Sequence, residues 1–270
     1  MGLPQDNAVA IRETRPLLGL SNDGHFTDKM DLSRRSHREV TMQFLVLGKG
    51  KTGSLVAEVA RERGHSVRAL DIDENLHALA LTEANLAKVD AVIDFTTPQA
   101  AAENIRAVLA LGGNIVVGTT GWYENLDEMK SLAKRFGGGL LYGTNFSIGV
   151  QKLFRLTAQL AQLDGYTFSI DETHHVSKLD APSGTAATLR EIILAARPAS
   201  GARPEVFIAS HRVGDAMGEH IVTAVSDSDT LEIRHEIKDR RCLALGAVRG
   251  AEWLAHNSGS HDFRDIFEQL

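Results

Sequence analysis

The sequence predicts an α/β fold in which a parallel sheet with helices on both faces is followed by a second α+β domain with an open mixed sheet. Strand-like and helix-like segments alternate from residue 44 to residue 142, a pattern typical of parallel sheets. A glycine-rich turn lies between the first strand and the first helix of this series. Beyond residue 205, three strand-like segments follow one another without an intervening helix, which indicates a second sheet.

The composition is that of an ordinary globular protein. Of the 270 residues, 43% are hydrophobic and 24% are charged, and the formal net charge of -6 gives no reason to expect a nucleic-acid partner. No apolar run is long enough to span a bilayer, so we expect no membrane partner. Cys242 is the only cysteine, which excludes an intrachain disulfide and fits a cytoplasmic protein.

Residues 1–40 differ from the rest of the chain. They contain no sustained apolar pattern, and the stretch with most apolar residues, 11–20, is interrupted by Pro16 and Gly19. A secretory signal needs an unbroken apolar region and a transit peptide is poor in acids, so neither is expected. We expect a disordered leader; the alternative is that the natural protein starts at Met42, where the folded pattern begins.

The glycine-rich turn has the spacing of a dinucleotide-binding loop. Phe44–Leu47 reads as a strand and Ser54–Arg63 as a helix. The residues between them are Gly48, Lys49, Gly50, Lys51, Thr52 and Gly53. In a G-x-G-x-x-G loop the first glycine permits the tight turn, the second lets a pyrophosphate approach, and the third lets the helix pack on the strand. This context predicts a Rossmann-like domain; the alternative is a flexible turn.

An acidic residue follows where such folds hold the adenosine ribose. His65–Leu70 reads as a second strand and leads to Asp71, 23 residues after Gly48. A carboxylate at this position hydrogen-bonds the ribose hydroxyls and favours NADH, although a solvated acid at a strand end is the alternative. Because Lys49 or Lys51 could reach a 2′-phosphate, we expect NADH to be favoured and NADPH to be accepted.

Three later turns are predicted to lie at one edge of the sheet. The strands Val89–Phe95, Asn114–Val117 and Leu140–Tyr142 are separated by helices at Gln99–Leu111 and Asn125–Phe136. Ligands of parallel sheets lie beyond the carboxyl ends of the strands. The turns that follow the three strands are Thr96–Pro98, Gly118–Gly121 and Gly143–Ser147. We expect them to line the nicotinamide end of the cofactor, the alternative for each being a plain βα turn.

The second half begins with a helix-length segment, Ile148–Leu163, and a strand-like segment, Tyr166–Asp171. Further helices are expected at Ala186–Ala196 and Gly246–His256. The consecutive strand-like segments are Glu205–Ser210, Glu219–Ser226 and Leu231–Ile237. The predicted domains are a dinucleotide-binding domain at 41–146, completed by 247–270, and a substrate-binding and oligomerisation domain at 147–246.

Residues 171–186 concentrate groups that suit proton transfer to an anionic substrate. His174 and His175 are adjacent, and histidines carry protons near neutral pH. Lys178 adds a positive charge. The residues just before the expected helix are Ser183, Gly184 and Thr185. A helix start offers unpaired N–H groups and a positive dipole end, so we expect it to hold a carboxylate.

Each of these features has a structural alternative. A histidine pair is often a surface or core pair, and a lone lysine is usually solvated. We expect no metal site, because His174 and His175 would point to opposite sides of an extended chain and no cysteine lies near them. We expect Glu172 and Asp180 to hold local structure. No role is assigned to His211, His220 or His235.

Taken together, the motifs resemble those of the 4-hydroxy-tetrahydrodipicolinate reductase (dihydrodipicolinate reductase) family. The most specific segment is H-H-x-x-K-x-D-A-P-S-G-T-A at residues 174–186. Further similar segments are D-F-T-x-P at 94–98, G-T-T-G at 118–121, N-F-S-x-G-V at 145–150, R-V-G at 212–214, G-E-H at 218–220 and G-A at 246–247. The resemblance runs from about Met42 to the C-terminal region. Some family members carry a longer glycine loop.

The resemblance implies an enzyme that uses NADH or NADPH to reduce 4-hydroxy-tetrahydrodipicolinate to tetrahydrodipicolinate in diaminopimelate and lysine biosynthesis. It implies His174 as proton donor and acceptor, Lys178 as second proton donor, and a homotetramer built through the second sheet. The expected substrate contacts are His175, Ser183, Gly184 and Thr185. The implied cofactor contacts are Gly118, Thr119, Thr120, Gly143, Thr144, Asn145 and Phe146.

Two other functions stay open from the sequence. One is a different two-domain dehydrogenase that acts on an amino acid. The other is a dinucleotide-sensing protein that has lost turnover, against which the intact pair of His174 and Lys178 argues.

Overall fold

The computed structural model describes residues 41–196 and 205–270. The predicted leader at 1–40 lies outside the described residues. Within the described residues, no helix is long and apolar enough to cross a membrane.

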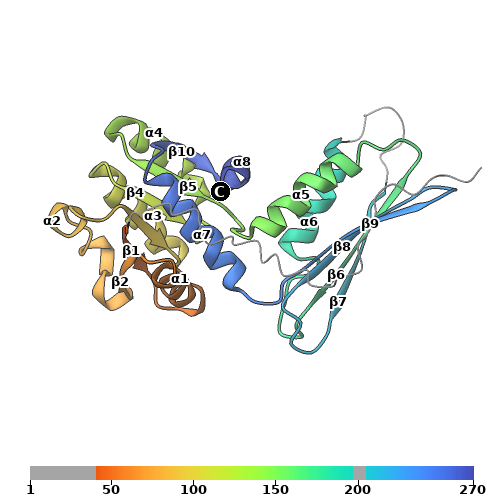
Figure 1. Cartoon of the computed structure of the whole chain (residues 1–270), viewed down its shortest axis with the longest axis horizontal. Coiled ribbons are helices and arrows are strands. Elements are labelled where there is room, and N and C mark those ends of the chain that lie inside the picture. The colour runs from red at the N-terminus through yellow and green to blue at the C-terminus, as the bar shows by residue number, and fades with distance from the viewer. Residues whose placement is uncertain (1–40, 197–204) are drawn as a thin grey trace, which may run out of the picture. The chain divides into compact units, whose positions relative to one another are not determined.

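A six-stranded sheet forms the first half of the fold (Figure 1). Its strands pair in the order β10-β5-β4-β3-β1-β2, and every pairing is parallel. The strands are β1 (Gln43–Leu47), β2 (Ser66–Leu70), β3 (Ala91–Asp94), β4 (Asn114–Val117), β5 (Gly139–Tyr142) and β10 (Gly259–Asp262). β3, β4 and β5 are almost wholly buried, as expected for parallel strands covered on both faces.

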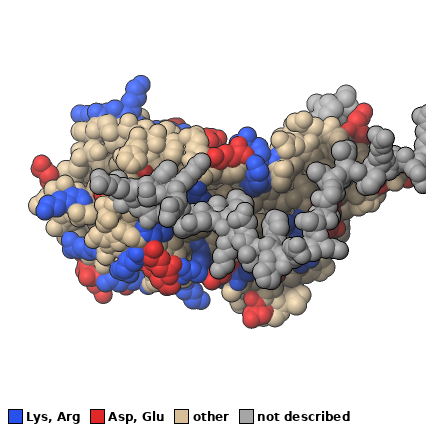
Figure 2. All heavy atoms as spheres, viewed as in Figure 1, with Lys and Arg blue, Asp and Glu red and all other residues tan. Residues whose placement is uncertain are grey.

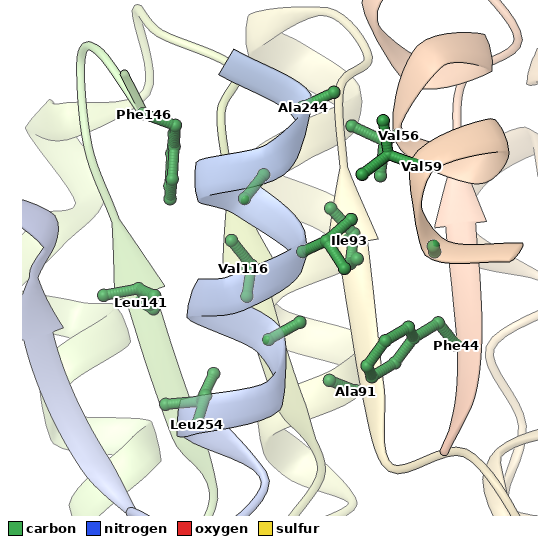
Figure 3. Packing of buried hydrophobic residues seen from close by; sticks show 14 of the residues in the cluster. Phe44, Val56, Val59, Ala91, Ile93, Val116, Leu141, Phe146, Ala244 and Leu254 are labelled. Atoms are coloured by element: carbon green, nitrogen blue, oxygen red, sulfur yellow. The ribbon is translucent and has the colours of Figure 1, made fainter. Parts of the chain in front are cut away.

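Helices cover both faces of this sheet. Figure 3 shows α7 (Arg241–Leu254) running along one face of the sheet, with Ala244 and Leu254 packed among strand residues such as Val116. α1 (Lys51–Glu62) packs beside α7 on the same face. α3 (Pro98–Ala110) and α4 (Leu126–Phe136) bury Ile105 and Met129 against the other face. The short helices are α2 (Glu83–Leu86) and α8 (Phe263–Ile266).

The second sheet has four strands in the order β7-β6-β8-β9. They are β6 (Thr167–His174), β7 (Phe207–Arg212), β8 (Glu219–Val225) and β9 (Thr230–Glu236). β6 and β7 are parallel, whereas β8 runs antiparallel to both β6 and β9. α5 (Ile148–Leu160) and α6 (Gly184–Ala196) pack on one face of this sheet (Figure 1). The predicted fold class, a Rossmann-like parallel sheet plus a second domain with a mixed sheet, is confirmed.

Three predicted boundaries are wrong, and one strand was not predicted. β6 continues to His174 instead of ending at Asp171, and α6 begins at Gly184 instead of Ala186. α7 begins at Arg241, five residues before the predicted Gly246. β10 was not expected, because its sequence Gly-Ser-His-Asp has no apolar residue; it forms by pairing with β5 at the sheet edge.

Acidic and basic side chains are interspersed on the surface. Figure 2 shows both signs scattered over the face in view, and among the described residues there neither sign forms an extended patch. This distribution agrees with the modest net charge of -6.

Candidate active site

The first pocket lies where the direction of strand order reverses. From β1 the chain adds β2 on one side and β3 on the other, and ligands of such sheets bind outside the strand ends at this switch point. A pocket of about 260 Å³ is found there. It is lined by Leu47, Gly48, Gly50, Leu70, Asp71, Ile72, Asn75, Phe95, Thr96, Thr97, Ala100 and Asn104.

The start of α1 leaves room for an anion. Gly50 is the N-cap residue, and no side chain caps the first turn of the helix, so its N–H groups are open to a ligand. A Cβ atom on Gly50 would meet nothing within 4 Å. In contrast, Gly48 has φ of 91°, and a Cβ on Gly53 would lie 2.0 Å from the Gly48 carbonyl oxygen. The residues present therefore fit a dinucleotide pyrophosphate.

Two carboxylates lie just after β2, where the sequence predicts contact with the ribose. Asp71 follows β2 and lines the pocket. Glu74 accepts a hydrogen bond from the Asp71 backbone N–H and pairs with the Lys49 ammonium. This pairing with Lys49 is the largest of the effects that hold the pKa of Glu74 below its ordinary value. Lys51 and Thr52, also predicted to contact the cofactor, lie in the first turn of α1 outside the pocket lining.

A buried carboxylate ties the neighbouring turns together. Asp94 ends β3 and is fully buried. It accepts hydrogen bonds from the hydroxyls of Thr96 and Thr119, both 2.8 Å, and from Asn104 Nδ2 at 2.7 Å. Burial raises the pKa of Asp94 despite these bonds. Sequence reasoning did not single out Asp94 as an organising residue, although it opens the D-F-T-x-P motif.

The predicted cofactor contacts in the later turns fall into different environments. The Thr119 side chain points to Asp94 and Phe146 is buried against Phe263, so only their backbones are free to meet a ligand. A Cβ on Gly118 would collide with the Phe95 ring. Thr120 is exposed, and a Cβ on Gly143 would lie 2.9 Å from the Cβ of Phe263. Thr144 and Asn145 line a second pocket.

That second pocket, of about 290 Å³, gathers both predicted catalytic residues and three of the four predicted substrate contacts. It is lined by Thr144, Asn145, Phe154, His174, Lys178, Ser183, Gly184, Thr185 and Thr188. Phe154 and Thr188 were missed, since they reach the pocket from the faces of α5 and α6. His175 is not part of the lining; its ring lies 2.7 Å from the Ser177 hydroxyl.

His174 ends β6 with its imidazole largely buried. Its Nδ1 atom has no hydrogen-bond partner within the described structure and lies 3.5 Å from Glu172 Oε2. Burial is the main cause that lowers the pKa of His174, and Glu172 opposes it. The imidazole is therefore neutral near pH 7. A dianionic ligand in the pocket would raise this pKa, because negative charge favours the protonated ring.

Lys178 and the start of α6 complete the pocket. The Lys178 ammonium donates to both carboxylate oxygens of Asp180, at 2.7 and 2.8 Å. The Ser183 hydroxyl accepts from the Ala186 N–H at 3.2 Å and so caps α6. Because the first helical N–H groups have no partner inside the helix, those of Gly184 and Thr185 are placed to receive a carboxylate.

Glu172 is the buried centre beneath this pocket. Both its oxygens accept from the Ser183 N–H, at 3.0 and 3.1 Å, and Arg212 Nη2 lies 3.2 Å from Oε1. Glu172, His174 and His220 each place one donor atom within 4.8 Å of the others. We assign no cation to this group, because the carboxylate is already hydrogen-bonded and faces the Arg212 guanidinium.

Such a pair of pockets, one on a parallel sheet and one beside an acid–base cluster, defines a dinucleotide-dependent oxidoreductase. The family model for the N-terminus of dihydrodipicolinate reductase matches residues 42–146, and that for its C-terminus matches residues 149–267. The chain belongs to the dihydrodipicolinate reductase family, and its cofactor is a nicotinamide dinucleotide.

Relatives match most of this chain. The 4-hydroxy-tetrahydrodipicolinate reductase of Christiangramia forsetii is 35% identical over 85% of this chain and 99% of its own length. The enzyme of the same name from Natronomonas pharaonis is also 35% identical, over 83% of this chain and 99% of its own.

Solved structures show the same fold. A dipicolinate-bound dihydrodipicolinate reductase from Paenisporosarcina sp. TG-14 has a TM-score of 0.71 at 22% identity, covering 86% of this chain and 100% of its own. An amine dehydrogenase from Mycobacterium smegmatis has a TM-score of 0.56 at 14% identity, covering 84% of this chain and 96% of its own. At these identities the likeness concerns the fold alone.

Proposed function

We propose that this chain reduces 4-hydroxy-tetrahydrodipicolinate to tetrahydrodipicolinate, a step of diaminopimelate and lysine biosynthesis. The observation that carries the proposal is the second pocket, which brings His174 and Lys178 together with the start of α6. A small dicarboxylate requires both a proton donor and anion-binding groups, and this pocket offers both. The curated relatives with this activity match over most of the chain.

Each residue of the second pocket has its own role in the proposed reaction. The bound nicotinamide would supply the hydride, and the 4-hydroxyl group of the substrate would leave as water. We assign the N–H groups of Gly184 and Thr185 to one substrate carboxylate, and Lys178 to the negative charge of the ring. His174 gives the proton, its pKa being raised by the arriving dianion so that it is protonated when needed. His175 and Ser183 act less directly: His175 lies outside the pocket lining, and Ser183 holds the helix start.

The test is turnover with the proposed substrate. NADH absorbance is followed while 4-hydroxy-tetrahydrodipicolinate is supplied enzymatically, and substrate-dependent loss of NADH is expected. Tight NADH binding without oxidation would instead identify a dinucleotide sensor. Reduction of NAD by an amino acid would identify the alternative dehydrogenase.

Cofactor preference follows from the charges at the ribose end. We propose that NADH is favoured over NADPH, because a 2′-phosphate would face Asp71 and Glu74 while Lys49 is already paired with Glu74. Glu74→Gln should release Lys49 and shift the ratio of kcat/KM towards NADPH by about fivefold. The ratio is measured with both cofactors, with Glu191→Gln, an exposed carboxylate of α6, as a charge-matched control. A wild-type preference for NADPH would refute the assignment.

We further propose a homotetramer assembled through the outer face of the second sheet. α5 and α6 cover only one face of that sheet. The other face presents Phe207 and Val225, 67% and 42% exposed, beside charged residues such as Glu219 and Arg234. Light scattering after gel filtration should give four times the mass of one chain. Phe207→Asp should reduce that mass, and a monomeric wild-type protein would contradict the proposal.

The two parts of the chain are assigned separate roles. We propose that residues 41–146, completed by 247–270, bind the cofactor, and that 147–246 bind substrate and form the oligomer. Pairing of β10 with β5 supports the return of the chain to the first sheet.

We place the enzyme in the cytoplasm, where metabolism regenerates reduced nicotinamide cofactors.

A further inference from the structure

A buried ion pair lies directly beneath the proposed catalytic pocket. Glu172 has 0% exposure, and the side chain of Arg212 is 19% exposed. The register of the second sheet explains how they meet: Glu172 and His174 are two residues apart on β6 and so share a face, and Arg212 is the β7 partner of His174. His220 on β8 is the partner of Glu172.

The pair contacts the three parts of the pocket that the proposed proton transfer uses: the start of α6, the loop that carries Lys178, and His174. Glu172 receives the Ser183 N–H, next to the start of α6, and lies 3.5 Å from His174 Nδ1. Arg212 donates to the backbone carbonyl oxygens of Lys178, at 3.2 Å, and of Asp180. Glu172 and Arg212 therefore link three parts of the pocket: His174, the start of α6, and the loop between β6 and α6 that carries Lys178, here called the lysine loop.

We propose that Glu172 and Arg212 are positioning residues that couple the carboxylate-binding start of α6 to the protonation of His174. This inference rests on the proposed function. Glu172 fixes Ser183, which aligns the free N–H groups of α6, and its negative charge stabilises the imidazolium form of His174. Arg212 keeps the carboxylate ionised in its buried setting and holds the lysine loop over the pocket.

Charge balance favours an ionised Glu172. Although burial raises its pKa, hydrogen bonds from Ser183, Ser210 and Arg212 leave the pKa below its ordinary value. Breaking one side of a buried pair strands the other charge, which explains why an acid and a base occur together here. The neutral alternative, a purely structural hydrogen-bond acceptor, would not need Arg212.

The groups facing His174 come from several elements. They are Glu172 on β6, Lys178 and Asp180 in the loop after it, Arg212 on β7 and His220 on β8. Lys178 and Asp180 pair with each other and largely cancel. Burial lowers the pKa of His220 to about 4, so this ring stays neutral above pH 5. Glu172 is the main group that favours the protonated ring of His174.

The test is the pKa of His174 itself, read by NMR from its imidazole proton in the folded protein without substrate, with the signal assigned through His174→Gln. Glu172→Gln should lower this pKa by about one pH unit. The sign is diagnostic: loosening the site would expose the ring and raise the pKa, whereas loss of the carboxylate charge lowers it. Glu191→Gln, an exposed carboxylate of α6 paired with Arg190, should leave it unchanged.

Turnover supplies the second readout. Because His174 gives a proton, kcat declines as pH rises through its pKa, and Glu172→Gln should move this decline to lower pH by about one unit. Arg212→Lys keeps the charge but loses the fork of donors, so it should raise KM for the dicarboxylate about tenfold or more while leaving the His174 pKa in place. The wild-type protein and Glu191→Gln serve as references.

The outcomes separate this inference from the proposed function. A wild-type protein without turnover would remove the function, yet the NMR titration would still measure the coupling. An unchanged or raised His174 pKa in Glu172→Gln would overturn the coupling even if the wild type is active. Should Glu172→Gln not fold, the double variant Glu172→Gln/Arg212→Gln avoids a stranded charge. It should still lower the pKa, because Glu172 acts on His174 more strongly than Arg212 does.

Discussion

Replacing His174 by glutamine should lower kcat by roughly 10²-fold while leaving the Kd for NADH within about twofold of the wild-type value. Glutamine keeps a polar side chain but cannot deliver a proton at neutral pH. The imidazole lines the second pocket and is absent from the lining of the first, so cofactor binding has no reason to change. Steady-state rates and fluorescence titration with NADH measure the two quantities.

The matched control is His256→Gln. His256 is an exposed histidine that follows α7, so this variant should keep wild-type kcat. A His174→Gln enzyme with near wild-type kcat would show that the proton comes from elsewhere, and Lys178 would then be the first group to examine. Equal losses of kcat and NADH affinity would indicate general damage to the fold.

Local motifs made the first pocket predictable. The residues from Gly48 to Gly53 are consecutive, and the roles of the three glycines are local: Gly48 adopts a positive φ, and Gly50 and Gly53 must lack a side chain. The Gly48 φ of 91° and the close approach of Gly53 to Gly48 agree with that interpretation. Asp71 at the end of β2 was equally predictable from the sequence, because it follows the glycine loop at a characteristic spacing within one βαβ unit.

The second pocket was predictable only where it is continuous in the sequence. His174 and Lys178 lie within eleven residues of Thr185, so one turn of chain brings them together. Arg212 and His220 join the same cluster through strand register, across about 40 residues. Alternation of polar and apolar residues does not reveal which strand pairs with which or in what register, so their partners could not be found.

Elements without an apolar pattern were also beyond the sequence. β10 has only polar residues and glycine, yet it pairs in register with β5 from Gly139 to Tyr142. The first turn of α7 was missed because the contacts of its first residue are made with another helix. Arg241 begins that helix with a charged side chain that pairs with Glu58 and Glu62 of α1, a contact that depends on the tertiary fold.

Two glycines of the same loop should respond to alanine in opposite ways. Gly50 has an ordinary extended backbone, and a Cβ there meets nothing in the protein. Gly50→Ala should therefore leave the Tm within about 2 °C, since the weaker N-cap offsets the lower entropy of the unfolded chain. Its NADH affinity should fall about tenfold or more, because the methyl group occupies the space that a pyrophosphate needs.

Gly53→Ala is the matched comparison and should damage the fold itself. Its Cβ would lie 2.0 Å from the Gly48 carbonyl oxygen, and a backbone atom does not yield as a flexible side chain does. Overpacking of this kind costs about 1–3 kcal/mol, which for a chain of this size lowers the Tm by roughly 2–10 °C. Differential scanning fluorimetry and NADH titration distinguish the two variants.

Comparison of the two variants separates the space that a bound cofactor requires from the space that the packing of the protein requires. A Cβ is forbidden at Gly53 by the packing of α1 on β1, whereas at Gly50 only a bound ligand excludes it. If Gly50→Ala bound NADH as tightly as the wild type, the space over the start of α1 would not be the pyrophosphate site. The uncapped N–H groups of that turn would then need another anion, and inorganic pyrophosphate is the simplest probe for one.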